Sequence, residues 1–65
     1  MERLMAHEII YDGRHYRMSV IELDASGAIR IYPYTHEIHS TRFVNGSVEV
    51  TVSGNPPHLV AKPVK

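Results

Sequence analysis

The sequence predicts an all-β fold: a small antiparallel meander of about five strands, twisted into a rolled sheet, a small barrel or a sandwich. Runs rich in β-branched and aromatic residues recur along the chain and are separated by short turns that contain glycine. Three turn signals stand out between these runs: Asp12-Gly13, Asp24 to Gly27, and Asn45-Gly46. Residues 34–40 form the one irregular connection, which is too short for a stable helix.

The first expected hairpin joins strands at residues 4–11 and 15–23 through the Asp-Gly turn, which is typical of a two-residue type I′ loop. This register places Glu8 opposite Arg17. The turn rule does not demand an opposite-charge pair, so the match supports the register independently.

The central hairpin covers residues 20–33 and is the stretch around which the rest is organised. Asp24 begins a type I turn, Gly27 takes its left-handed position, and Glu22 then faces Arg30. Pro33 lacks an N–H group and ends the strand. The opposite face of this hairpin carries four aliphatic side chains: Ile21, Leu23, Ile29 and Ile31.

A third hairpin is expected from strands at residues 41–44 and 47–53, with Asn45-Gly46 as its turn and Arg42 opposite Glu49. Residues 1–54 would then form the β-meander domain. Residues 55–65 would form a Pro-containing C-terminal tail, either an edge strand or a segment that orders only against a partner.

These registers leave both faces of the sheet apolar over part of their length. A bulge near Ser19–Ile21, with strong twist, would roll the strands around one core. Burial of the second face against another copy is the alternative. The candidate interface residues are Ile21, Leu23, Ile29, Ile31, Tyr32 and Tyr34.

The composition narrows the class of protein. A chain of 65 residues without cysteine has neither disulfides nor thiolate zinc sites, so self-association is the favoured supplement to a small core. Seven basic and seven acidic side chains give no net charge, which argues against a nucleic-acid partner. The sequence has no long apolar run and no signal-peptide region, so we expect a cytoplasmic protein without a membrane partner.

The chain offers little for catalysis or metal binding. His36-Glu37-Ile38-His39 lacks the H-E-x-x-H spacing of zinc proteases and is interpreted as a polar connection. The tyrosines, Tyr11, Tyr16, Tyr32 and Tyr34, lack the cations of a nucleic-acid surface and are interpreted as packing residues. We therefore predict no catalytic residue, no metal ligand and no cofactor, and a protein that is not an enzyme.

Three segments carry a resemblance to a known family: Ala-His-Glu-Ile-Ile-Tyr-Asp-Gly at 6–13, Ser-Val-Ile-Glu-Leu-Asp-Ala-Ser-Gly-Ala-Ile-Arg-Ile-Tyr-Pro at 19–33, and Phe-Val-Asn-Gly-Ser-Val-Glu-Val at 43–50. Together they resemble the small N-terminal β-domain of metal-dependent amidohydrolases. That family places a metal-binding H-x-H motif shortly after these strands, whereas this chain has Gly-Asn-Pro-Pro-His at 54–58. The resemblance therefore implies a curved β-domain without hydrolase activity, and no catalytic residue is carried over.

The sequence thus favours a non-enzymatic interaction module that self-associates, most simply as a homodimer. An accessory or regulatory subunit of a larger enzyme is the alternative, which the resemblance to the amidohydrolase β-domain suggests.

Overall fold

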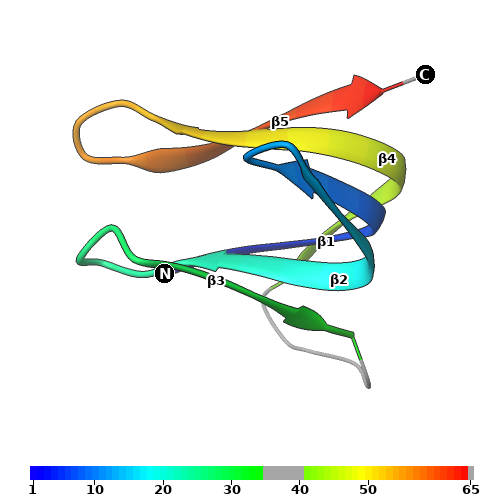
Figure 1. Cartoon of the computed structure of the whole chain (residues 1–65). Helices are drawn as coiled ribbons and strands as arrows, with labels where there is room; N and C mark the ends of the chain where they lie inside the picture. The colour runs from blue at the N-terminus through cyan, green and yellow to red at the C-terminus, as the bar shows by residue number, and fades with distance from the viewer. Residues whose placement is uncertain (35–40, 65) are drawn as a thin grey trace.

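The computed structural model describes residues 1–34 and 41–64 and confirms the all-β class. Within these residues the chain forms a single five-stranded sheet (Figure 1). Among them, no helix is long and apolar enough to cross a membrane. The strands are β1 (Glu2–Tyr11), β2 (Arg14–Leu23), β3 (Ile29–Pro33), β4 (Arg42–Ser53) and β5 (His58–Val64).

The strand order is β3-β2-β1-β4-β5, which is a mixed sheet rather than a purely antiparallel meander. β1 pairs with β4 in parallel, while the other three neighbouring pairs are antiparallel. A parallel pair needs a connection that returns the chain to the starting end of the sheet. Here that connection runs from the end of β3 to the start of β4. β3 and β5 remain at opposite edges, so the sheet does not close into a barrel.

Both predicted registers of the first two hairpins are confirmed. Glu8 lies opposite Arg17 in the β1–β2 pair, and Glu22 lies opposite Arg30 in the β2–β3 pair. The turn between β2 and β3 is built as expected around Asp24, whose carboxylate accepts bonds from the backbone N–H groups of Ser26 and Ala28. Gly27 has a φ of 90° and donates its N–H to the carbonyl of Asp24 at 3.0 Å.

The third predicted hairpin is wrong. Asn45-Gly46 does not reverse the chain but lies inside β4, which runs without interruption from Arg42 to Ser53. The first part of β4 pairs with β1 on the side away from β2, so it satisfies backbone groups that a separate hairpin would leave unpaired. Arg42 consequently lies beside Leu4, and Glu49 lies between Ile10 and Lys62.

Gly46 lies in a β-bulge of β4 instead of in a turn. The β1–β4 register shifts between Ala6 and Glu8, where β1 advances two residues while β4 advances three, from Val44 to Ser47. The φ of Gly46 is 91°, a conformation that glycine adopts without steric cost.

The sheet bends sharply at this bulge, and the neighbouring strands β1 and β2 bend along the same line. The β1–β2 pairing is interrupted at His7 and Met18, with paired residues on both sides of them, and Met18 has a φ of 44°. The Ser19 hydroxyl donates to the Arg17 carbonyl at 2.9 Å across this point. The β1–β2 register is the same on both sides of this point, so the bulge predicted near Ser19–Ile21 is wrong, and the extra residue lies in β4 instead. We call the line through His7, Met18 and Asn45-Gly46 the bend.

The bend folds one sheet into two layers (Figure 1). β3 and the second half of β2 lie in the first layer, and β5 and the second half of β4 lie over them. On β1 the inward-facing positions change from Leu4 and Ala6 before the bend to Ile9 after it, which explains why both faces read as apolar. The buried core cluster between the layers consists of Leu4, Ala6, Ile9, Ile21, Leu23, Val48, Val50 and Leu59.

The C-terminal segment is part of the sheet. Residues His58–Val64 form β5, the first of the two alternatives for the tail, and Leu59 is buried in the core. The Glu2 carboxylate accepts a bond from the Leu59 backbone N–H at 3.2 Å and contacts the His58 ring at the same distance. These contacts join the start of β1 to the start of β5 across the two layers.

The left-handed backbone at Met18 predicts that Met18→Gly stabilises the fold. A non-glycine residue pays a steric penalty at φ 44°, so the variant should raise the free energy of unfolding by about 0.5–1 kcal/mol after the extra chain entropy of glycine is subtracted. Urea denaturation measures this change. Met18→Ala is the matched control, because it shortens the side chain and keeps the penalty; a glycine variant no more stable than the alanine variant contradicts the prediction.

Gly46→Ala tests the same bend in the opposite direction. A Cβ built on Gly46 meets no atom within 4 Å, so its cost comes from the backbone conformation alone. We expect a loss of about 1–2 kcal/mol in the free energy of unfolding. An unchanged midpoint in urea would show that β4 passes the bend without a left-handed residue.

Candidate functional site

A cleft opens beside β3, between this strand and the tip of the β1–β2 hairpin. Its volume is about 450 Å³. Ile29 and Ile31 are half-buried and form its apolar floor. The remaining walls come from the hairpin tip: Tyr11, Asp12, Arg14 and Tyr16. The cleft therefore combines aliphatic and aromatic surface with one acidic and one basic group at its rim.

The hydrogen bonds at the two ends of β3 show which way its backbone groups point. The Tyr34 N–H donates to the Met18 carbonyl at 2.8 Å, and the Asp24 N–H donates to the Ala28 carbonyl at 3.1 Å. In an antiparallel pair the bonded positions alternate, so the even-numbered residues of β3 bond to β2. The N–H and C=O groups of Ile29 and Ile31 consequently point away from the sheet.

Pro33 occupies the next outward-pointing position and has no N–H to offer. In the described part of the chain, β3 pairs only with β2. The outer edge of β3 therefore presents the donors of Ile29 and Ile31 and the carbonyls of Ile29, Ile31 and Pro33. We call this edge, together with the cleft beside it, the β3 edge site.

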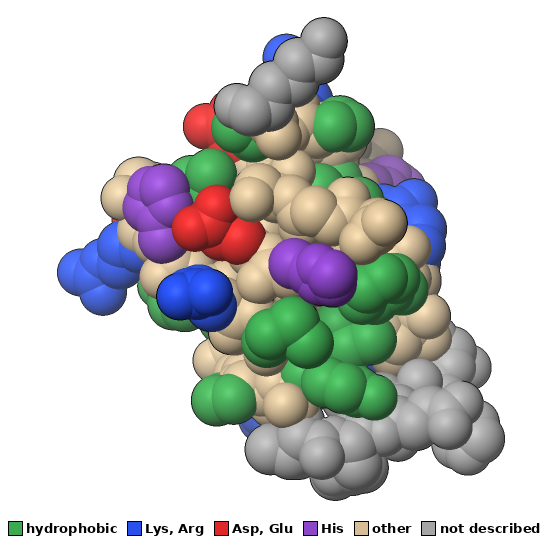
Figure 2. Space-filling view, turned by 90° about the vertical axis from the view of Figure 1, so that its right-hand side faces the viewer, with side chains coloured by type: hydrophobic (Ala, Val, Ile, Leu, Met, Phe, Trp, Pro, Cys, Tyr) green, Lys and Arg blue, Asp and Glu red, His purple; other side chains and the backbone are tan. Residues whose placement is uncertain are grey.

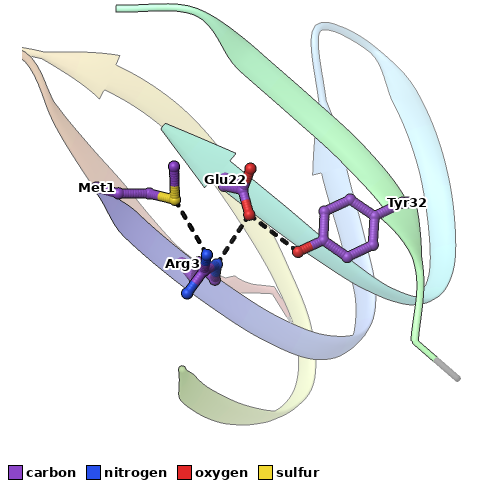
Figure 3. Close-up of polar contacts among 4 residues, drawn as sticks. All are labelled: Met1, Arg3, Glu22 and Tyr32. Atoms are coloured by element: carbon purple, nitrogen blue, oxygen red, sulfur yellow. Dashed lines mark hydrogen bonds and ion pairs between the residues drawn. The ribbon is translucent and has the colours of Figure 1, made fainter. Parts of the chain in front are cut away.

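A polar network lies on the opposite face of β3 (Figure 3). The Glu22 carboxylate accepts bonds from Arg3 Nε at 2.8 Å and from the Tyr32 hydroxyl at 3.0 Å, so three strands meet at one carboxylate. Arg3 Nη2 also contacts the sulfur of Met1 at 3.1 Å. Glu22 is only 8% exposed, and its bonds compensate the burial.

The same contacts shift the pKa values of Glu22 and Tyr32. The hydrogen bond from Arg3 lowers the pKa of Glu22 below its ordinary value of 4.5, against an opposing effect of burial, and the Tyr32 hydroxyl adds to the lowering. Burial, and then the bond to Glu22, raises the pKa of Tyr32. Glu22 is therefore an ionised structural acceptor, not a proton donor for chemistry.

A second carboxylate is held in a similar way next to the bend. Glu8 accepts a bond from the Ser47 hydroxyl at 2.8 Å and contacts His15 Nδ1 at 3.2 Å. These contacts, Ser47 first, lower the pKa of Glu8. Because the carboxylate stands between the hydroxyl and the imidazole, the histidine cannot act as a base toward Ser47, and the three residues do not form a nucleophilic arrangement.

The bend also carries exposed apolar side chains. Met18 and Phe43 are 45% and 48% exposed, and the His7 ring lies edge-on to Phe43 with 5.6 Å between ring centroids. Figure 2, which looks onto the bend, shows hydrophobic side chains gathered beside a histidine there. We call His7, Met18 and Phe43 the bend patch.

The structure separates the six candidate interface residues. Ile21 and Leu23 are 0% and 2% exposed in the core, so neither offers a surface to a partner in this conformation. Ile29 and Ile31 line the cleft, and Tyr32 lies on the other face, bonded to Glu22. Tyr34 is half-buried at the end of β3.

The remaining sequence features do not combine into a site. Tyr11 and Tyr16 line the cleft while Tyr32 lies on the opposite face, so the tyrosines share no single surface. Across residues 1–34 and 41–64, no three His, Asp or Glu side chains come close enough together to hold a metal ion. His36 and His39 lie outside the described residues.

Sequence reasoning missed two parts of the site. Asp12 is predicted only as part of the first turn, although the structure places that turn over the apolar side of β3, where Asp12 lines the cleft. Arg3 was not paired with Glu22, although extending the first register by one position beyond Leu4 places these two residues opposite each other.

The fold was also compared with known proteins. A scan against protein-family models finds no match, and searches of curated proteins and of solved structures find no significant match to this chain.

The Glu22 network predicts a pH-dependent contribution to stability. Because folding lowers the pKa of Glu22, its contribution is complete above pH 4.5 and is lost as the pH falls further, through the folded-state pKa. Glu22→Gln should therefore lower the free energy of unfolding by about 1–2 kcal/mol at pH 7, and the difference from wild type should shrink toward pH 3.

Urea denaturation at several pH values measures this difference. Glu49→Gln removes an exposed carboxylate from β4 and serves as the control. A Glu22→Gln deficit that stays constant from pH 7 to pH 3 would mean that packing, rather than charge, accounts for the loss.

Proposed function

We propose that this chain is a non-enzymatic interaction module that self-associates as a homodimer through the β3 edge site. The observation that carries the proposal is the set of outward-pointing backbone groups of Ile29 and Ile31 beside the open cleft. Strand edges of this kind are templates for pairing with another chain.

The side chains of β3 favour a partner on this edge. Ile29 and Ile31 are packed against the core cluster yet only half-buried, so they leave apolar surface facing the cleft. A further strand added to β3 would bring its own inward-facing side chains onto that surface. Pairing would thus satisfy the backbone groups and cover apolar area in one step.

Size and charge favour a second copy as the partner. A 65-residue chain buries a small core, and association is the supplement that remains without disulfides. Seven acidic and seven basic side chains give no net repulsion between copies. A five-residue edge makes a small interface, so we expect a dissociation constant of about 10–100 µM.

The polar side chains support binding rather than catalysis. Three carboxylates, those of Glu8, Glu22 and Asp24, have a lowered pKa, and each accepts hydrogen bonds that keep it ionised. Among the described residues, every buried side-chain nitrogen and oxygen has a hydrogen-bond partner. These three carboxylates therefore serve as hydrogen-bond acceptors within the fold.

Ile31→Pro should weaken the dimer at least tenfold. Proline removes the outward N–H of residue 31 and leaves the bonds between β2 and the even-numbered residues of β3 in place. Sedimentation velocity from 5 to 500 µM measures the change, and circular dichroism checks that the variant folds. Phe43→Ser is the matched control, because it removes an exposed apolar side chain of the bend patch.

Hydrogen exchange tests the same edge without a substitution. The amides of Ile29 and Ile31 should exchange rapidly at 5 µM and become protected at 500 µM, whereas those of Arg30 and Tyr32 bond to β2 and should be protected at both concentrations. A wild-type chain that stays monomeric at 500 µM, with unchanged exchange at Ile29 and Ile31, would refute the proposal.

The accessory-subunit alternative, and the resemblance to the amidohydrolase β-domain that suggests it, stay predictions. Affinity copurification from the native host distinguishes this alternative from self-association. A stoichiometric larger enzyme that is retained by the Ile31→Pro variant would favour the accessory role.

A further inference from the structure

Resting on the proposed function, we infer that two copies pair their β3 strands antiparallel about a two-fold axis through Ile31. Each subunit then contributes Ile31 and Pro33 to the cleft of the other. The inference follows from the direction of the backbone groups, the length of β3 and the side chains on its two faces.

The outward-pointing groups restrict the register. Only the odd-numbered residues of β3 present N–H or C=O groups outward, so odd positions of one copy must face odd positions of the other. An antiparallel pair meets this condition whenever the axis passes through a residue, and axes through Arg30, Ile31 and Tyr32 keep the most of β3 paired. A register centred between two residues would place outward groups opposite inward ones.

An axis through Ile31 gives the largest overlap, because this residue is the middle of the strand Ile29–Pro33. Ile31 and its copy exchange two hydrogen bonds, and the N–H of each Ile29 reaches the carbonyl of Pro33 of the partner subunit. The absent N–H of Pro33 costs one bond at each end. Four bonds result, which use both outward donors of each copy.

The other two axes are less favourable. An axis through Arg30 also allows four bonds but places Arg30 directly opposite Arg30 of the partner subunit, a like-charge pair that destabilises a sheet. It also moves Pro33 past the start of the partner's strand. An axis through Tyr32 pairs Ile31 with the partner's Pro33 and retains only two bonds within the strands.

With the axis at Ile31, the side chains complement each other on both faces. On the outer face, Arg30 lies across from Tyr32 of the partner subunit, a cation over an aromatic ring. That ring is already fixed, since its hydroxyl donates to Glu22 at 3.0 Å. The hydrogen bonds among Arg3, Glu22 and Tyr32 therefore hold the ring in place for the partner's guanidinium.

On the inner face, the partner completes the cleft. Ile31 of the partner subunit lies beside Ile31, and the partner's Pro33 lies beside Ile29, so both contact the apolar floor that a single copy leaves open. The tyrosines of the hairpin tip remain as the opposite wall. The cleft of about 450 Å³ is thus bounded by one copy in the monomer and by two in the dimer.

Cysteine cross-linking tests the register directly, because the chain has no cysteine of its own. Arg30→Cys and Tyr32→Cys should form a mixed disulfide when equimolar variants are oxidised at 200 µM. Directly opposed residues at this non-bonded position lie about 4.5 Å apart between Cα atoms, within disulfide reach. Mass spectrometry separates the mixed dimer from the two homodimers, and we expect the mixed species to be at least fivefold more abundant than the two homodimers together. Phe43→Cys mixed with Arg30→Cys is the control and should show no excess.

The outcomes separate the register from the dimer itself. Preferential Arg30→Cys homodimers would place the axis at Arg30 and overturn the inference while self-association stands. Preferential Tyr32→Cys homodimers would do the same for an axis at Tyr32. A wild-type chain that sediments as a monomer at 500 µM refutes the dimer, and the inference with it. Ile31→Cys, which faces its own copy only with the axis at Ile31, should give a homodimer and provides a second variant if Tyr32→Cys fails to fold.

Discussion

The bend in the sheet is the constraint on which the rest of the structure depends. A flat five-stranded sheet of this length would leave one apolar face in water. Bending β1, β2 and β4 along one line places two halves of the same sheet face to face, so Leu4 and Ile21 of one layer share a core with Val48 and Leu59 of the other. The cost is local and falls on the backbone, as a left-handed conformation at Gly46 and Met18.

The sequence of each turn was sufficient to predict the pairing of the two strands that it joins in the first two hairpins. The Asp-Gly turn and the turn from Asp24 to Gly27 each fix a register through their own backbone geometry, and both registers are observed. Asn45-Gly46 has the same turn chemistry, but the left-handed glycine is used inside a strand. What decides between these uses is the parallel partner β1, about forty residues away in sequence, and no turn rule contains that information.

The candidate site also has features that the local sequence predicts and features that depend on distant strands. The alternation of Ile29 and Ile31 with Arg30 and Tyr32 could be read from the sequence, and it correctly separates the two faces of β3. That β3 is an edge could not be read, because its position depends on β4 joining the sheet on the far side of β1. The burial of Ile21 and Leu23 likewise depends on the bend, which covers these side chains with the second layer.

The two edge strands of this open sheet, β3 and β5, are not equally available for pairing. This difference would explain why association stops at two copies. β5 carries Lys62 and Pro63, a charged residue and one without an N–H, both of which discourage strand addition. β3 ends at Pro33, which withholds the third outward donor and limits pairing to the donors of Ile29 and Ile31. A strand that pairs with its own copy about a two-fold axis uses the same edge on both subunits. After the dimer forms, neither subunit has a free β3 edge to bind a third copy. The short, proline-terminated β3 therefore favours a closed dimer, whereas pairing β3 of one copy with β5 of the next would leave free edges and build an open fibre.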